Sequence, residues 1–193
     1  MTSTGHPAAS DPRRGRRAFL ALAALFFLPV AVAFFLYYGG AWRPGGATNH
    51  GELIEPPRPL PAAPGAELLR GKWTLVYVGD GACDAACRQS LLVMRQTRLA
   101  LNNEMTRVQR VLLATGRCCD REFLDREHPG LVVLDGTRPE LRPLLATFPA
   151  EGREFSVFIV DPLGNLMMRE DARADPRGFL KDLRKLLKLS HIG

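Results

Sequence analysis

The chain has 193 residues, of which 46% are hydrophobic and 24% charged, and its formal net charge is +6. That length leaves about one domain once any targeting segment is set aside, which is enough for a real core. Half of the net charge comes from the first 40 residues, with four arginines and one aspartate; because the rest lacks a basic stripe with interleaved aromatics, we expect no nucleic-acid partner.

Residues 18–38 form an uncharged apolar run, AFLALAALFFLPVAVAFFLYY. A helix of that length crosses roughly 30 Å of hydrocarbon, so we predict one transmembrane helix behind a basic N-terminus at 1–17. The arginines before it keep the N-terminus cytoplasmic and place the rest of the chain across the membrane. In a bacterium this predicts a single-pass inner-membrane protein whose soluble domain lies in the periplasm, an oxidising compartment.

A cleaved export signal is the alternative. The stretch RRAFLA resembles a twin-arginine signal core, and AVA at 31–33 resembles a signal-peptidase site. The apolar run continues beyond that site, which favours an uncleaved anchor, and both alternatives export the soluble part. Residues 39–65 are rich in Pro and Gly and predict an extended linker before a domain at 66–193.

Alternating β-rich and helical patterns organise that domain. Strands are predicted at 73–79, 108–115, 131–136, 155–161 and 166–170, and helices at 84–102, 139–148 and 176–190, with a short helical stretch before 131. The last two strands flank a PLGN turn and indicate a hairpin. The order strand, helix, strand, helix, hairpin, helix is that of thioredoxin, so the predicted class is α/β, with a central mixed sheet flanked by helices.

The four cysteines stand as two close pairs, Cys83 with Cys87 and Cys118 with Cys119. Each pair follows a predicted parallel strand, where sites form in open α/β sheets, so the second loop can approach the first. If Cys83 and Cys87 share the first helical turn, their Cβ atoms lie roughly 5 to 6 Å apart, too far for a disulfide. Spacing therefore favours a metal, and a disulfide requires a distorted turn or Cys83 in the preceding loop.

Thiolate chemistry suits that position. A helix N-terminus favours the thiolate, soft thiolates select Cu(I), and zinc is the other candidate. No second Cys or His pair stands at zinc-finger spacing. Cys83 and Cys87 are thus predicted metal ligands or a redox pair, with two inert thiols as the remaining alternative. Cys118 and Cys119 are either additional ligands or a partly buried or oxidised local reservoir.

The Cys-x-x-x-Cys motif after a strand, the later VDPLGN hairpin and the N-terminal anchor resemble the Sco/SenC family of copper chaperones over residues 66–190. The resemblance implies that Cys83 and Cys87 bind copper for delivery to a cytochrome c oxidase subunit or another copper-acceptor protein. The family's distal histidine is replaced here by Arg153, and its proline after the first cysteine by Asp84. The chain is identified as a divergent member.

The sequence is compatible with three functions. The first is a membrane-anchored assembly factor for cytochrome c oxidase that binds Cu(I) or keeps the thiols of a copper acceptor reduced. The second is a periplasmic thiol-disulfide oxidoreductase that acts without copper, because loss of one ligand weakens metal binding but leaves dithiol chemistry intact. The third is a pseudo-chaperone that binds assembly partners without using its thiols.

Overall fold

The computed structural model describes residues 12–39, 49–190 and 192. Most of the predicted basic N-terminus, at 1–11, and part of the predicted linker, at 40–48, lie outside the described residues. The chain divides into two compact units, Met1–Ala47 and Thr48–Gly193, and each is described by itself.

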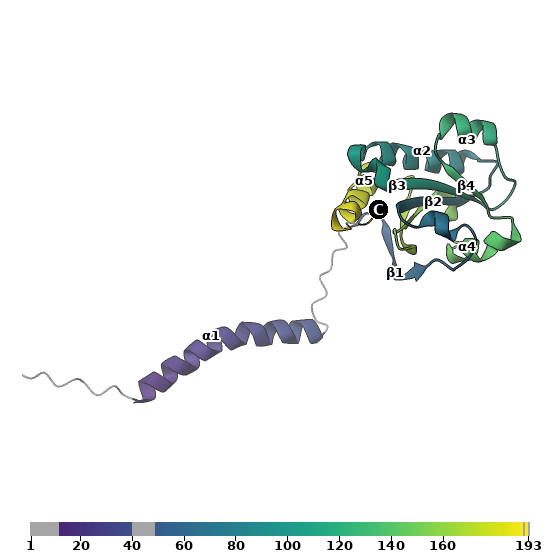
Figure 1. Ribbon diagram of the computed structural model, residues 1–193. Coiled ribbons are helices and arrows are strands. Elements are labelled where there is room, and N and C mark those ends of the chain that lie inside the picture. Colours follow the sequence, from purple (N-terminus) through teal and green to yellow (C-terminus); the bar gives the residue numbers. More distant parts are fainter. Residues whose placement is uncertain (1–11, 40–48, 191, 193) are drawn as a thin grey trace, which may run out of the picture. The chain divides into compact units, whose positions relative to one another are not determined.

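Helix α1 (Pro12–Tyr38) makes up the described part of the first unit (Figure 1). Its stretch Gly15–Tyr38 has 24 residues with a mean hydropathy of 2.7, and by length and composition it can cross a membrane. Its large apolar side chains are exposed. A helix that is apolar all round without protein to cover it suits a lipid environment, so the predicted N-terminal apolar helix is confirmed as a candidate span.

Among the described residues of the second unit, six strands form one mixed sheet in the order β1-β6-β5-β2-β3-β4. Their bounds are β1 (Glu52–Pro59), β2 (Trp73–Gly79), β3 (Val108–Ala114), β4 (Val132–Asp135), β5 (Ser156–Val160) and β6 (Asn165–Asp171). Strands β2, β3 and β4 are parallel, whereas β5 is antiparallel to both β2 and β6. Strand β2 is central and buried on both faces, which explains its nearly continuous apolar sequence.

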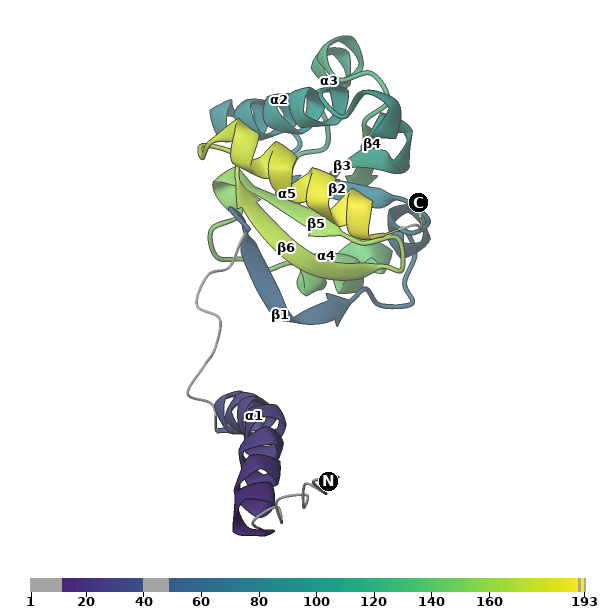
Figure 2. The same ribbon diagram turned by 90° about the vertical axis from the view of Figure 1, so that its left-hand side faces the viewer.

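Helices cover both faces of this sheet. They are α2 (Ala85–Leu99), α3 (Arg121–Glu127), α4 (Arg142–Thr147) and α5 (Pro176–Leu189), with short 3-10 turns η1 (Ala66–Leu69), η2 (Asn102–Arg107), η3 (Pro139–Leu141) and η4 (Arg153–Phe155). Figure 2 shows α2 and α5 together on one face and α4 on the other. Side chains alternate between faces along β2: Leu75 and Tyr77 join the core under α2, α3 and α5, while Val76 and Val78 join the core under η1 and α4. The predicted thioredoxin-like α/β fold is confirmed.

Strand β1 is the element that the sequence does not predict. We expected Glu52–Pro59 inside the linker, yet it pairs antiparallel with β6 at the edge of the sheet, with a register shift between Leu53 and Arg58. Its side chains are almost all exposed, so it carries no alternating apolar pattern. Prolines, which cannot donate to a ladder, are tolerated on such edge strands and at bulges. The composition of this segment therefore does not predict a strand, and β1 forms because it pairs with β6.

Candidate thiol site

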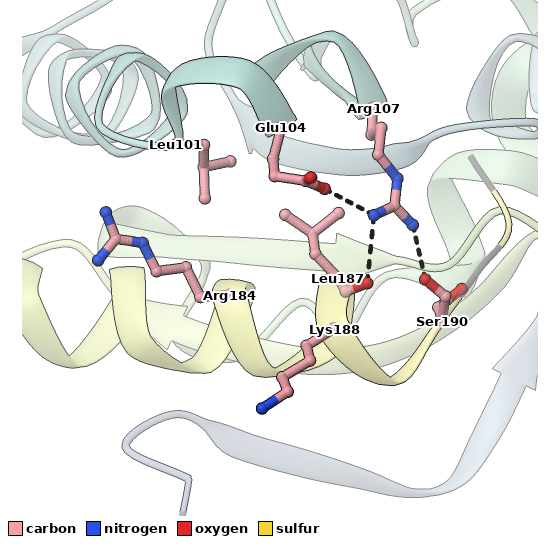
Figure 3. A pocket seen from close by; sticks show the side chains of 7 residues that line it. All are labelled: Leu101, Glu104, Arg107, Arg184, Leu187, Lys188 and Ser190. Carbon is pink, nitrogen blue, oxygen red and sulfur yellow. Dashed lines mark hydrogen bonds and ion pairs between the residues drawn. The ribbon is translucent and has the colours of Figure 1, made fainter.

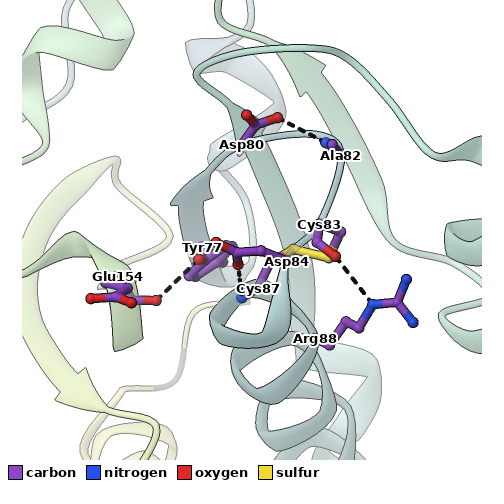
Figure 4. The surroundings of a disulfide bond; sticks show 8 residues. All are labelled: Tyr77, Asp80, Ala82, Cys83, Asp84, Cys87, Arg88 and Glu154. Carbon is purple, nitrogen blue, oxygen red and sulfur yellow. Dashed lines mark hydrogen bonds between the residues drawn. A yellow bond between two sulfur atoms is a disulfide. The ribbon is translucent and has the colours of Figure 1, made fainter.

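The first cysteine pair lies where β2 connects to α2, with Cys83 in the connecting loop and Cys87 in the first turn of α2 (Figure 4). Asp80 organises this loop: its Oδ1 accepts a hydrogen bond from the Ala82 N–H at 2.9 Å, and its carbonyl oxygen accepts one from the Cys83 N–H at 3.1 Å. Cys83 has a φ of 52°, in the left-handed region that residues other than glycine rarely adopt. The chain therefore turns at Cys83 before the helix begins.

Asp84 caps the helix. Its Oδ1 accepts a hydrogen bond from the Cys87 N–H at 3.0 Å, so Cys87 lies in the first turn while Cys83 lies outside it. The two cysteines form a disulfide, with Cα atoms 4.9 Å apart, within the usual range for such a bond. The sequence left open whether both cysteines share the first helical turn, and in the structure they do not. Cys83 lies in the preceding loop, which is the condition under which the sequence allowed a disulfide.

Both sulfurs of this pair are inside the protein. Cys83 is 1% exposed and Cys87 is fully buried, in the core cluster that also holds Tyr77. The Tyr77 hydroxyl donates to the carbonyl oxygen of Glu154 at 3.0 Å, which fixes η4 (Figure 4). Burial raises the pKa of Tyr77 to about 12, and the negative charges of Asp84 and Glu154 add to this effect. The phenol is therefore protonated at neutral pH and remains a hydrogen-bond donor.

The second cysteine pair follows β3 and touches the first loop. Cys118 and Cys119 form a disulfide with Cα atoms 3.1 Å apart. The Asp120 N–H donates to the Gly81 carbonyl oxygen at 3.0 Å. A Cβ on Gly81 would lie 2.6 Å from the Arg117 carbonyl oxygen and 3.0 Å from Cys119 Sγ, so the close approach requires glycine. The two cysteine loops are in contact, in agreement with the expectation from the two parallel strands.

Arg153, which we expect at the position of the family histidine, donates to the main chain. Arg153 lies in η4, and its guanidinium donates to the carbonyl oxygens of Leu145, Phe148 and Pro149 at the end of α4. Burial lowers its pKa. A guanidinium that already donates to these carbonyls is no metal ligand.

The structure describes two histidines, His50 and His128, and neither belongs to a group of metal-ligating side chains. His128 ends α3 and is 4% exposed; burial, and then the charges of Arg110 and Arg95, lower its pKa, so the ring is neutral at pH 7. The His50 Nδ1 lies 3.0 Å from Asp182 Oδ1. Among the described residues, no group of three or more His, Cys, Asp or Glu side chains is placed to hold a metal. The donor set for a soft metal is thus the sulfurs, once their disulfides are reduced.

A groove of about 560 Å³ lies at the C-terminal end of α5 (Figure 3). Its lining residues are Leu101, Glu104, Arg107, Arg184, Leu187, Lys188 and Ser190. Arg107 joins its walls by donating to Glu104 at 2.6 Å and to the carbonyl oxygens of Leu187 at 3.2 Å and Ser190 at 2.6 Å. None of the four cysteines lines this groove.

No curated protein sequence matches this chain. Among solved structures, apo Sco1 from Thermus thermophilus has 20% identity and a TM-score of 0.58, covering 74% of this chain and 99% of that one. Copper-bound yeast Sco1 has 17% identity and a TM-score of 0.54, covering 65% and 84% respectively. Copper-bound ScoI from Bradyrhizobium japonicum has 17% identity and a TM-score of 0.51, covering 62% and 88%.

At these identities the similarity establishes the fold, and the predicted resemblance to Sco/SenC proteins is confirmed at that level. Residues 73–190 match the family described as a transmembrane-like, thioredoxin-like, C-terminal domain. This match covers more than half of the chain and includes β2, both cysteine pairs and α5. The chain therefore belongs to that family.

Proposed function

We propose that this protein is a membrane-anchored assembly factor for cytochrome c oxidase whose Cys83 and Cys87 keep the thiols of a copper-acceptor protein reduced. One observation carries the proposal: the two cysteines form a disulfide where β2 ends and α2 begins, in a thioredoxin-like domain. In the reduced state, one thiolate attacks a client disulfide and forms a mixed disulfide. The second thiol resolves it, so the client gains two electrons and the Cys83–Cys87 bond forms.

The N-terminus of α2 supports this exchange. The first N–H groups of a helix have no partner within the helix and stabilise negative charge placed near them. Cys87 lies in that first turn, and its own N–H is already engaged by Asp84. When the disulfide breaks, negative charge appears on the Cys87 sulfur. The other N–H groups of the first turn of α2 stabilise that charge.

The proposed setting is the bacterial inner membrane. The helix at 18–38 anchors the chain in a single pass, the segment 1–17 stays cytoplasmic, and the thioredoxin-like domain lies in the periplasm. An oxidising compartment suits a domain whose four cysteines are paired. Since β1 belongs to the sheet, we propose that the linker comprises residues 39–51 and that the domain begins with β1 rather than at residue 66.

Cu(I) binding by the reduced pair is the second candidate. It is supported by two soft sulfurs whose Cα atoms lie 4.9 Å apart, and by the fold shared with copper-bound Sco structures. Cys118 and Cys119 are the proposed additional donors, because their loop contacts Gly81. In this proposal, copper is cargo, and the disulfides must be reduced before a sulfur can bind it.

Trapping of mixed disulfides tests the exchange. We expect the reduced wild-type chain to reduce an oxidised peptide that carries the paired cysteines of a copper acceptor. A Cys83→Ser or a Cys87→Ser variant should accumulate a peptide adduct on its remaining cysteine, and the double variant should give none at these positions. Full activity of the double variant would end the proposal. Assembly of active oxidase by a strain with Cys83→Ala and Cys87→Ala would favour the pseudo-chaperone.

Anaerobic titration tests the copper candidate separately. The reduced chain, held in detergent micelles, competes for Cu(I) with a chromogenic chelator, and we expect one ion per chain. The Cys83→Ser, Cys87→Ser variant should lose this binding. Equal affinity of the variant and the wild-type chain would exclude these cysteines as ligands and leave thiol exchange intact.

A further inference from the structure

The two disulfides differ in access to solvent. Cys83 is 1% exposed and Cys87 is fully buried, whereas Cys118 is exposed and Cys119 is half-buried. A protein thiol must reach a sulfur atom in order to attack it. In this structure the Cys83–Cys87 bond offers a macromolecular partner no exposed sulfur, whereas the neighbouring pair contains an exposed residue, Cys118.

Several contacts join the loop of the first pair to the segment of the second. The Asp120 N–H bonds to the Gly81 carbonyl oxygen at 3.0 Å, and Cys119 packs against the core cluster that contains Cys83 and Cys87. Arg88 adds a further link: its Nε donates to the Cys83 carbonyl oxygen at 3.1 Å, and its guanidinium carbon lies 4.3 Å from the centroid of the Phe123 ring in α3. The segment that contains the second pair is thus held against the loop of the first.

We propose that Cys118 and Cys119 form a relay that carries electrons between a protein dithiol outside and the buried Cys83–Cys87 pair. The inference rests on the proposed function and names the entry point that this function lacks. Cys118 is the outer sulfur, because it is exposed. Cys119 is the inner sulfur, because it is half-buried and packs on the core cluster of Cys83 and Cys87.

The steps balance in sulfur bonds and electrons. A thiolate of the donor dithiol attacks Cys118, the Cys118–Cys119 bond breaks, and the donor's second thiol resolves the mixed disulfide. Cys119 then attacks Cys83, and Cys87 leaves as a thiolate. Cys118 attacks Cys119, which restores the outer disulfide and releases Cys83. Two electrons and two protons have passed from the donor to Cys83 and Cys87, and the reverse sequence serves a client disulfide.

A kinetic comparison with two reductants tests the relay. The oxidised full chain in detergent is mixed with reduced thioredoxin as a protein dithiol, or with a small trialkylphosphine, and is quenched by alkylation for peptide mapping. With thioredoxin, reduction of Cys83–Cys87 should slow by about tenfold or more in a Cys118→Ser, Cys119→Ser variant. With the phosphine, wild type and variant should match, which shows that the variant is folded around an intact inner disulfide.

The outcomes separate the relay from the proposed function. Equal thioredoxin rates in wild type and variant overturn the relay and leave the function of Cys83 and Cys87 standing. If thioredoxin reduces Cys118–Cys119 in the wild type while Cys83–Cys87 never opens, both the relay and the exchange function fail. The relay is supported if Cys83–Cys87 is reduced slowly in the variant with thioredoxin, but at the wild-type rate with the phosphine.

Cross-linking tests which sulfur faces inward. A Cys87→Ala, Cys118→Ala variant retains Cys83 and Cys119, and we expect mild oxidation with oxidised glutathione to join them in most molecules. The matched Cys87→Ala, Cys119→Ala variant retains Cys83 and the outer Cys118, and its yield should be lower by about fivefold or more. Absence of the Cys83–Cys119 bond, with both thiols recovered free, overturns the assignment.

Discussion

Two clusters of side chains handle charge in different ways. The acid cluster consists of two buried carboxyl groups, Glu170 of β6 and Asp182 of α5, and the exposed His50, which pairs with Asp182. Burial by itself raises the pKa of Asp182, but the N–H groups of Gly51 and His50, together with the His50 ring, outweigh it and hold that pKa below its usual value. Burial, followed by the charge and hydrogen bond of Asp182, raises the pKa of Glu170 to about 8. At neutral pH, hydrogen-bond donors keep Asp182 ionised, and the neighbouring Glu170 stays protonated.

The cysteine cluster, Cys83 with Cys87 and the half-buried Cys119 that packs on the same core, has little of this support. A disulfide carries no charge and requires no hydrogen-bond donor, so it is stable at 1% exposure or less. A thiolate at the same place needs donors, as Asp182 does, and the helix terminus is the source that the structure offers. Burial therefore makes the acid cluster sensitive to pH and the cysteine cluster sensitive to redox state.

The largest expected effect concerns Glu170. Because its pKa is raised on folding, its contribution to stability is complete below the unfolded pKa of about 4.5 and is lost as the pH rises towards 8. Glu170→Gln should remove this dependence, on the order of 3 kcal/mol between pH 5 and 8. Urea unfolding of the full chain in detergent at several pH values measures it. The exposed Glu140→Gln is the control, and equal pH slopes in the two variants would contradict the assignment.

An intermediate effect is expected at the inner disulfide. Replacing both cysteines, as Cys83→Ala with Cys87→Ala, should lower the free energy of unfolding by about 2 kcal/mol, since a short closed loop restricts the unfolded chain only modestly. The Cys118→Ala, Cys119→Ala variant, which removes the exposed disulfide between adjacent residues, should lose about 1 kcal/mol. Urea midpoints under non-reducing conditions compare them. A larger loss for the outer pair would contradict the view that the inner pair belongs to the core.

The smallest expected effect lies outside both clusters, at Arg153. Its guanidinium caps carbonyl oxygens at the end of α4, so Arg153→Met should cost about 1 kcal/mol of stability. Cu(I) affinity and thiol exchange should not change, because the guanidinium is directed at those carbonyls and not at the sulfurs. A changed affinity in the anaerobic titration would show that this position still acts on the site.

Local patterns predicted much of the fold. Strand β2 (Trp73–Gly79) was expected at these same residues, because a buried central strand is apolar throughout. The helix expected over 176–190 corresponds to α5 (Pro176–Leu189), whose apolar residues recur at helical spacing. The long helix expected over 84–102 ends earlier, at Leu99, and the chain continues into η2. Element ends depend on caps and tertiary contacts, which periodicity does not encode.

The acid cluster could not be predicted. His50 lies in a Pro- and Gly-rich segment, and Glu170 and Asp182 belong to different elements, so no local motif joins them. Sequence reasoning missed Glu170 and Asp182 for that reason. The only signal was weak: each is a charged residue at a position where the strand or helix period calls for an inward side chain.

By itself, the sequence determined the apolar N-terminal helix, the order of the main strands and helices, and the place of both cysteine pairs beyond parallel strands. These depend on composition and period, which neighbouring residues set. Only the tertiary structure decided that Cys83 turns out of the helix, that β1 joins the sheet, and that Gly81 brings Cys119 against the core of the first pair. Backbone dihedrals at a loop and contacts between distant segments arise when the sheet is assembled, and no local pattern records them.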